Sequence, residues 1–398
     1  MACLFMLLAA IGLATTCVAK EPVSLAESFL HEGDFAEGET ALLVHLDANP
    51  GDDEARFGLG VIQFFRAVEN LGQALYEYGA VSENATEPFL RLPVPQNPDP
   101  AEITHAELGR VLELFAADLA RAEATLADIE DDNVKLRLRL ADITLDFTGT
   151  GEQQTQLLEL LNKLNGGPLD LQKANPDFRI HFDRGDVAWL RAYCHALSAL
   201  AEAYGAVDVE PGFSDRVARV FPRVRATPDR EDEKRPNAVK IADAPHLRRM
   251  RLHLVAVCKL NRETWRHIRS ETDDDFEWLS HAKQTDQLGL PLSEEQVNAW
   301  LAMLEQLEGL LTGQRLMPNI WVRMVDPNLA KGKGVNFRKV LDDPPTLLLD
   351  FDRIRSEGVD EKYLEDEAAK PAFDMTVIWR IPQLFSGPFG IARAVRLN

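Results

Sequence analysis

The sequence predicts a mainly α-helical protein, a bundle of packed helices with a few short β-strands in its middle and C-terminal parts. Three observations lead to this prediction. Apolar residues recur every three or four positions over long stretches, which is the spacing of one helix face. Strictly alternating stretches, which are typical of strands, are short and few. Hydrophobic residues make up 45% and charged residues 27% of the 398 residues, a balance that supports a sizeable core.

An apolar segment begins the chain. Residues 1–19 contain no charged side chain, and the run from Leu4 to Leu13 is typical of the apolar region of a signal peptide. Small side chains at both ends of Cys17-Val18-Ala19 are compatible with cleavage before Lys20, although no Lys or Arg precedes the run. We expect an exported protein located in the periplasm, in the cell envelope or outside the cell. An uncleaved membrane anchor and a lipoprotein are the alternatives.

Three helices separated by short turns are predicted after this segment. Helices are expected over 24–33, 35–49 and 54–75. Gly33-Asp34 supplies the first turn, and Asn49-Pro50-Gly51-Asp52 supplies the second. Together they form a helical hairpin that we assign to residues 20–80.

This hairpin resembles a tetratricopeptide repeat. The resemblance is carried by Gly33-Asp34-Phe35, Leu42, Leu46, Pro50, Ala55, Leu59 and Gly60, and by the 34-residue spacing from Leu25 to Leu59 and from Ala26 to Gly60. It covers about one and a half repeats, whereas such folds need roughly three for stability. The hairpin is therefore expected to be stabilised by packing against the rest of the chain. The resemblance implies a concave face that binds a protein or peptide partner. We expect the polar side chains of Glu27, His31, Gln63 and Arg66 to be exposed and to line it, with plain solvated helix surface as the alternative.

A proline-rich linker is predicted over 81–101, because five prolines exclude a regular element there. A helical core with short strands follows over 102–315. Its helices are expected at 102–130, 153–164, 186–204, 245–269 and 293–312, and its strands at 134–140, continuing over 142–147, and at 178–182. The charged segment 226–243 is expected to be an exposed loop.

The periodicity weakens after Arg315. A mixed C-terminal region over 316–398 is expected to pack on the core, with short strands at 319–325, 346–351 and 374–380. From 130 onwards the chain resembles uncharacterised exported proteins of bacteria, a likeness that implies no mechanism.

Cys194 and Cys258 fall on the apolar faces of two predicted helices. We expect two buried thiols there, with a disulfide as the alternative in an exported protein.

The segment Asp146–Glu152 faintly resembles an EF-hand calcium loop, with Gly151 at the sharp turn. Thr148 and Thr150 stand where acids normally are, and Leu157 stands where the last glutamate belongs. We therefore expect a plain glycine turn.

A second candidate metal site consists of His181, Asp183 and Asp186. Alternation along a strand places His181 and Asp183 on one side, and Asp186 follows in the first turn of the next helix. The structural alternative is that Asp186 caps that helix while Asp183 pairs with Arg184, Arg191 or the turn backbone.

The formal net charge of −21 argues against nucleic acid as a partner. The most basic stretch, His246–Arg269, is expected to form ion pairs with the acidic helix at 293–308 or with Asp273-Asp274-Asp275. Contact with a membrane is expected only through an uncleaved N-terminal segment.

The sequence contains no GxxxxGK[ST], HExxH or GxSxG motif, and we predict no cofactor. We therefore expect a non-enzymatic protein-interaction or structural component of the cell envelope. The alternative is an exported metal-dependent hydrolase with its site near His181, Asp183 and Asp186.

Overall fold

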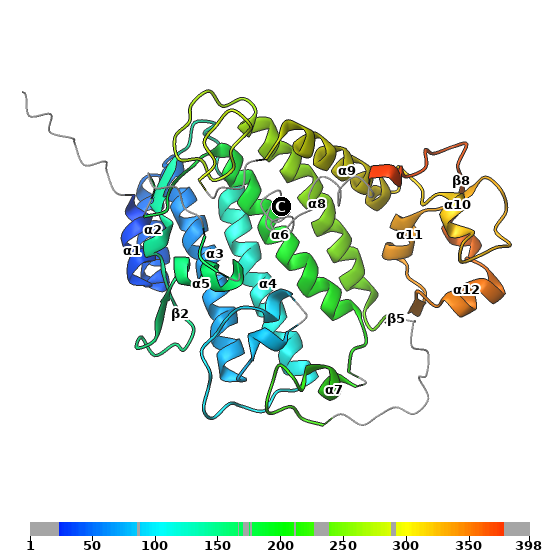
Figure 1. Ribbon diagram of the computed structural model, residues 1–398, viewed down its shortest axis with the longest axis horizontal. Helices are drawn as coiled ribbons and strands as arrows, with labels where there is room; N and C mark the ends of the chain where they lie inside the picture. The colour runs from blue at the N-terminus through cyan, green and yellow to red at the C-terminus, as the bar shows by residue number, and fades with distance from the viewer. Residues whose placement is uncertain are drawn as a thin grey trace, which may run out of the picture.

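The protein is mainly α-helical, as predicted. The computed structural model describes residues 24–377 apart from 86–87, 166, 170–174, 176, 211, 227–238 and 288–291. The long helices stand side by side in chain order, so that α3, α4, α6, α8 and α9 each pack on the next (Figure 1). The N-terminal and central helices are α1 (Leu25–Glu32), α2 (Phe35–Ala48), α3 (Asp53–Glu77), α4 (His105–Ala127), α5 (Leu157–Asn165), α6 (Arg184–Ala206), α7 (Phe213–Val217), α8 (Ala244–Ile268) and α9 (Glu294–Thr312).

Helices α1, α2 and α3 form the expected hairpin. Gly33 ends α1 in the left-handed region, at φ 76°, and the carboxylate of Asp52 caps α3 by accepting the N–H of Ala55. A Cβ atom at Gly38 would lie 2.7 Å from the Cβ of Phe29, so only glycine permits this close approach of α1 and α2. The likeness to a tetratricopeptide repeat stays a prediction.

The linker before α4 contains two short 3₁₀ turns, η1 (Ser82–Asn84) and η2 (Pro88–Leu90). The expectation that prolines exclude any regular element was therefore wrong, because a single 3₁₀ turn does not need the N–H that proline lacks. The linker is fastened by backbone hydrogen bonds from Val81 N–H to Val220 O and from Ile103 N–H to Arg223 O. Thr104 and Glu107 then begin α4 with a reciprocal capping box.

The described strands form four small antiparallel pairs. They are β1 (Leu136–Arg139) with β4 (Arg179–Phe182), β2 (Thr144–Asp146) with β3 (Gln154–Gln156), β5 (Val239–Lys240) with β7 (Leu347–Leu348), and β6 (Lys333–Val335) with β8 (Leu364–Asp366). In the first pair Leu136 lies opposite Phe182. The short turn η3 (Leu140–Asp142) separates β1 from β2. The helix expected over 153–164 begins later, at Leu157, because residues 154–156 pair with β2.

The C-terminal region differs most from expectation. It contains α10 (Asn319–Val322), α11 (Phe337–Asp342), α12 (Phe351–Glu357) and the turn η4 (Glu361–Tyr363). The strand predicted at 319–325 was wrong, because Pro318 stands at the N-cap and residues 319–322 turn into a helix. Strand β7 lies within the predicted 346–351, whereas 374–377 form no strand and 378–380 lie outside the described residues.

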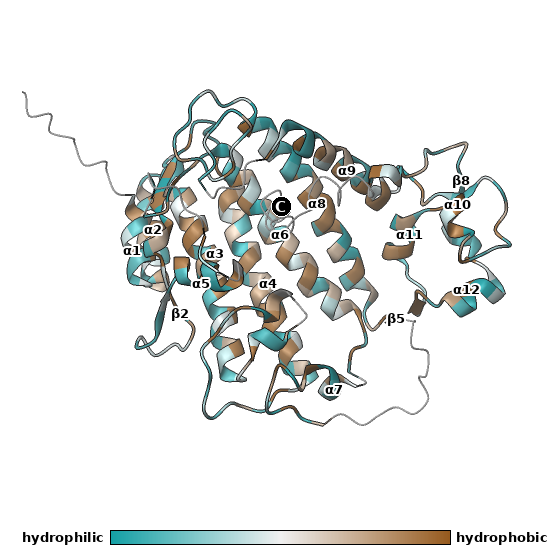
Figure 2. Ribbon diagram, viewed as in Figure 1, coloured by the Kyte–Doolittle hydropathy of each residue, from teal (hydrophilic) through white to brown (hydrophobic). Residues whose placement is uncertain are grey.

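Each long helix has an apolar side (Figure 2), and these sides meet in several buried clusters. Cys194 and Cys258 are free and buried, as expected, and burial raises the pKa of both thiols, that of Cys258 to about 12.

Within the described residues, no helix combines the length and the hydropathy needed to cross a bilayer. The expected signal peptide over 1–19, most of the 226–243 loop and the end of the chain lie outside these residues.

Candidate functional site: an apolar cavity beside a carboxylate cluster

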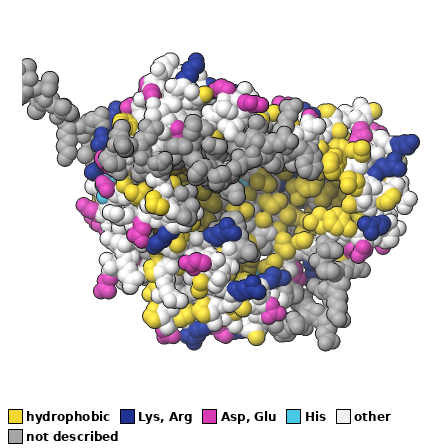
Figure 3. Space-filling model, viewed as in Figure 1, with side chains coloured by type: hydrophobic (Ala, Val, Ile, Leu, Met, Phe, Trp, Pro, Cys, Tyr) yellow, Lys and Arg dark blue, Asp and Glu magenta, His cyan; other side chains and the backbone are white. Residues whose placement is uncertain are grey.

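An apolar cavity of about 390 Å³ lies between α3 and α6. One stripe of α3 and one stripe of α6 form its long walls, and side chains of α4, α5, the small strands and two loops close it. Hydrophobic side chains also gather in a hollow of the surface over α6 and α8 (Figure 3). The lining residues from α3 are Phe57, Val61, Phe64, Phe65, Val68 and Leu71, those from α6 are Asp186, Trp189, Leu190, Tyr193 and Leu197, and those from α5 are Leu157, Leu160, Leu161 and Leu164.

Helical spacing explains why these side chains share one space. On α6 the lining residues recur at intervals of three and four, which places them on one face of the helix. Those on α3 recur in the same way. Helices α3 and α6 both pack on α4. Their lining faces border the same cavity, and four leucines of α5 form another part of its wall.

Aromatic rings are concentrated at the α6 side of the cavity. Trp189 and Tyr193 stack with ring centroids 5.3 Å apart, and Trp278 meets Trp189 edge-on at 5.5 Å. Phe182, the last residue of β4, lies 6.1 Å from Trp278. These four rings all line the cavity.

The first turn of α6 carries two acids that cap it reciprocally. Oδ1 of Asp183 accepts the N–H groups of Gly185 and Asp186 at 2.7 and 3.3 Å, and the N–H of Asp183 donates to Oδ2 of Asp186 at 3.1 Å. Asp183 is thus the N-cap and Asp186 stands three positions on, which corrects the expectation that Asp186 is the cap. Arg184 does not pair with Asp183 but donates to the carbonyl of Ile129.

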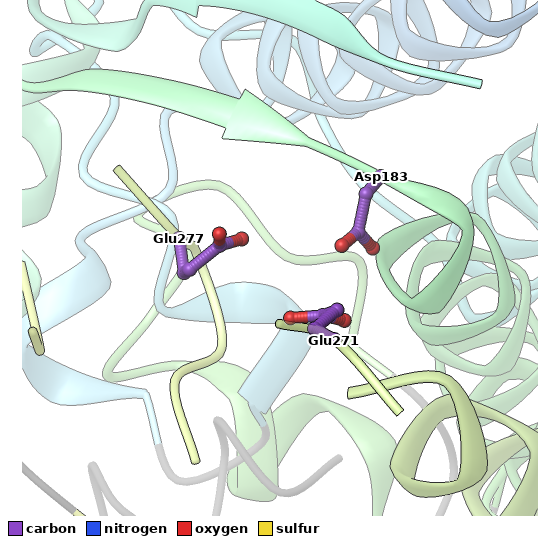
Figure 4. Close-up of side chains that lie close together, drawn as sticks. All are labelled: Asp183, Glu271 and Glu277. Atoms are coloured by element: carbon purple, nitrogen blue, oxygen red, sulfur yellow. The ribbon is translucent and has the colours of Figure 1, made fainter. Parts of the chain in front are cut away.

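Asp183 also belongs to a cluster of three carboxylates, which we call the carboxylate cluster: Asp183, Glu271 and Glu277. One oxygen from each lies within 4.8 Å of the others. Figure 4 shows the three side chains converging from the start of α6 and from the segment after α8. Glu271 Oε2 accepts from Gln284 at 2.9 Å, and Glu277 Oε1 accepts from the N–H of Asp275 at 3.1 Å. Glu271 Oε1 is fully buried and no described group donates to it.

Burial and repulsion between neighbouring acids raise the pKa values of Glu271, Glu277 and Asp186. Burial, followed by the charge of Asp183, raises the pKa of Glu271 to about 9. Burial is also the main cause that raises the pKa of Glu277 to about 7. The pKa of Asp186 is raised well above its usual value, again mainly by burial and then by the charge of Asp183. The site therefore favours protons or another cation among its oxygens.

The structure does not bring the predicted metal set together. His181 is 3% exposed, and its Nδ1 lies 3.0 Å from Oδ2 of Asp275 instead of facing the carboxylate cluster. Asp183 joins the cluster, whereas Asp186 turns to the cavity. Among the described residues, the only group with metal-ligand spacing is therefore Asp183 with Glu271 and Glu277.

Sequence reasoning missed Glu271 and Glu277. They follow α8 and stand 88 and 94 positions after Asp183, so no local spacing connects them. The only available signal is the acidic stretch 271–277, whose central aspartates are one of the two acidic segments that the sequence offers as partners of the basic helix α8. In the structure Asp273 and Asp275 pair with Lys135, at 2.6 and 3.6 Å.

The hairpin residues Glu27, His31, Gln63 and Arg66 form two internal networks. The expectation that they are exposed was wrong for Glu27 and Gln63, each 5% exposed. Glu27 accepts from the N–H and the Nε of Arg139, at 3.0 and 3.1 Å, and His31 contacts the carbonyl of Arg139. Gln63 and Arg66 both donate to Glu39. Helix packing against β1 and α4 buries these groups, and binding of a partner by the hairpin stays a prediction.

The loop at Asp146 is a glycine turn, as expected. Its carboxylate accepts from the N–H groups of Thr148, Gly149 and Gly151 and from the Thr148 hydroxyl, at 2.6–3.0 Å. These bonds occupy the oxygens that a calcium ion would need.

The basic helix α8 pairs with the acidic helix α9, as predicted. Arg262 contacts Glu308, and Arg269 lies 3.1 Å from Glu294. Arg251 pairs instead with Asp342 of α11 at 2.7 Å, and Arg249 pairs with Glu202 of α6 at 2.9 Å.

Comparison of this chain with protein-family models, curated proteins and solved structures finds no match. The functional argument therefore rests on the cavity and the carboxylate cluster.

Proposed function

We propose that this protein is a binding protein for a small molecule with a long apolar body, held in the cavity between α3 and α6. The predicted export signal would place this binding outside the cytoplasm. The observation that carries the proposal is the cavity itself, about 390 Å³ in volume and lined almost wholly by aliphatic and aromatic side chains.

The size and lining of the cavity support this proposal. Small-molecule sites in proteins enclose about 300–1,000 Å³ and combine apolar walls with a few polar groups. Close-packed interiors leave few voids larger than a water molecule. A space of this volume is therefore more than imperfect packing, and an alkyl chain matches its walls.

The test is binding of a neutral apolar fluorophore, N-phenyl-1-naphthylamine, to the purified protein. We expect saturable binding of one probe per chain with increased emission. Val61 of α3 lines the cavity and is 5% exposed, so Val61→Phe and Val61→Trp add atoms to this space. The probe affinity should fall in that order, by about tenfold or more for the larger side chain.

Leu114→Trp is the matched control, because Leu114 of α4 is 62% exposed and lies away from the cavity lining. It should bind the probe as the parent protein does. If the parent protein and the three variants bound the probe with equal affinity, the probe would bind outside the cavity, and the proposal would be wrong. Thermal unfolding of each variant checks that it is folded.

A second candidate function is binding of a divalent cation at the carboxylate cluster. The specific observation is that Glu271 Oε1 is buried without a donor while three carboxylates converge within 4.8 Å. Carboxylate oxygens are the ligands that Ca²⁺ and Mg²⁺ prefer. Such a site could serve the metal-dependent hydrolase considered from the sequence, although with Glu271 and Glu277 in place of His181 and Asp186.

This candidate is tested by calorimetric titration with Ca²⁺, Mg²⁺ and Zn²⁺ at pH 8. A site at the cluster requires saturable binding of one ion that Glu271→Gln removes. Binding that survives this substitution, or no heat from any of the three ions, excludes it.

A further inference from the structure

A single acid lines the cavity, whose described walls are apolar apart from this residue and Arg91. Asp186 lies in the first turn of α6, and only 3% of the residue is exposed. Its Oδ2 accepts the N–H of Asp183, and no Lys, Arg or His forms an ion pair with it among the described residues. The other charged lining residue, Arg91, lies in an exposed position where its Nε donates to the carbonyl of Ala85. Asp186 is therefore the one buried carboxyl group of the described lining. Because burial favours its neutral form, its ionised form becomes favourable beside a bound cation.

The walls around this acid are aromatic. Trp189 and Tyr193 stand one and two turns beyond Asp186 on the same face of α6. Trp278 and Phe182 continue the aromatic wall from outside the helix. Aromatic faces attract organic cations, and several rings around one position are the usual means of binding an ammonium group.

The surroundings of Asp186 add further negative potential. Asp183, its capping partner, belongs to the carboxylate cluster with Glu271 and Glu277. The nearest cationic side chain on α6, Arg184, donates to the carbonyl of Ile129 and lies 3.9 Å from acids outside the cluster, Asp132 and Glu263. A negatively charged ligand group would meet repulsion here, and a positive one would be stabilised.

We infer that the ligand of this cavity is a cationic amphiphile, whose ammonium group lies beside Asp186 and the surrounding aromatic rings while its alkyl chain extends along the apolar walls of α3 and α5. This inference rests on the proposed function and names the ligand class of the same site.

The experiment compares three twelve-carbon ligands with different head groups, each below its micellar concentration. Dodecyltrimethylammonium, dodecan-1-ol and dodecanoate compete with N-phenyl-1-naphthylamine at pH 8. We expect the ammonium ligand to bind about tenfold more tightly than the alcohol, and dodecanoate to bind most weakly. Asp186→Asn keeps an oxygen that can accept the Asp183 N–H, so α6 remains capped. In this variant the advantage of the ammonium over the alcohol should disappear.

Glu113→Gln is the control for net charge, since it removes one negative charge from an exposed position on α4. It should keep the full preference for the ammonium ligand. Equal displacement by all three ligands, or an ammonium preference that survives Asp186→Asn, would overturn the inference and leave the proposed function standing. Failure of the probe and of every ligand to bind would overturn both.

Discussion

Buried acids have opposite surroundings in two regions of the molecule. In the hairpin, Glu39 of α2 is 7% exposed and accepts hydrogen bonds from Gln63 and Arg66, with Arg121 3.4 Å away. At the start of α6, Asp183 lies beside the glutamates of the carboxylate cluster and Asp186 lines the cavity, and no Lys, Arg or His pairs with either acid among the described residues.

The pKa values follow these surroundings. Burial acts to raise the pKa of Glu39, but the bonds from Gln63 and Arg66 outweigh it and hold that pKa below its usual value. At the cluster, burial and like charge act in the same direction, and the pKa of Glu271 rises to about 9. The difference shows that the hairpin uses its buried acid to hold helices together, whereas the α6 region keeps acids that favour a cation.

The largest effect is expected from Glu39→Ala. This substitution leaves the Gln63 amide buried and Arg66 without its carboxylate, so the free energy of unfolding should fall by about 2–4 kcal/mol at pH 7. Because the folded pKa of Glu39 is lowered, its contribution is present above the unfolded pKa and disappears as the pH falls through the folded pKa. Urea unfolding at pH 7 and pH 3.5 measures both statements.

Glu37→Ala serves as the control, since Glu37 is exposed on the same helix. It should change the free energy of unfolding by less than about 0.5 kcal/mol. If Glu39→Ala lowered the free energy of unfolding by no more than this, the hydrogen bonds and ion pair of Glu39 would contribute little to stability.

A smaller effect of opposite sign is expected from Glu271→Gln. The folded pKa is raised from 4.5 to about 9, so the stability linked to this group is present below pH 4.5 and is lost as the pH rises toward 9. Glutamine has a similar shape without the charge. At pH 8.5 the variant should be more stable than the parent by about 1–2 kcal/mol, and at pH 5 the two should be nearly equal.

The control for this prediction is Glu295→Gln, which removes one charge from an exposed position of α9. It should show no such dependence on pH. Destabilisation by Glu271→Gln at pH 8.5 would show instead that the folded cluster depends on a charged Glu271.

The sequence predicted the helices best where a wide apolar stripe coincides with capping residues. Helix α9 begins after Ser293, whose hydroxyl accepts the Gln296 N–H, and ends at Gly313 in the left-handed region. Local chemistry fixes both ends of this helix. The failures fall where tertiary contacts decide. Residues 154–156 form a strand only because β2 lies beside them, and the short apolar run at 320–322 has no periodicity that separates strand from helix.

The candidate site was predictable only in part, for two physical reasons. Periodicity identifies which face of α6 is apolar, as it did for Leu190 and Leu197, but it does not say whether the opposite wall is close enough to fill the space. The carboxylate cluster joins the start of α6 to the segment after α8, and such a contact depends on how the helices pack. Only Asp183 and Asp186, which share one helix turn, could be connected from their spacing.

The smallest effects are expected at Asp183, which belongs both to the helix cap and to the cluster. At pH 5, where Glu271 and Glu277 hold protons, Asp183→Ala should cost about 1 kcal/mol because Gly185 and Asp186 lose their acceptor. Asp183→Asn keeps an acceptor oxygen and should stay within about 0.5 kcal/mol of the parent at that pH. At pH 8.5 Glu277 is ionised, so the asparagine variant should become the more stable protein because it removes the repulsion between Glu277 and residue 183. Urea unfolding of both variants at the two pH values distinguishes the contribution of the helix cap from that of the cluster. If Asp183→Asn lowered the free energy of unfolding equally at pH 5 and pH 8.5, the carboxylate would act only as a cap.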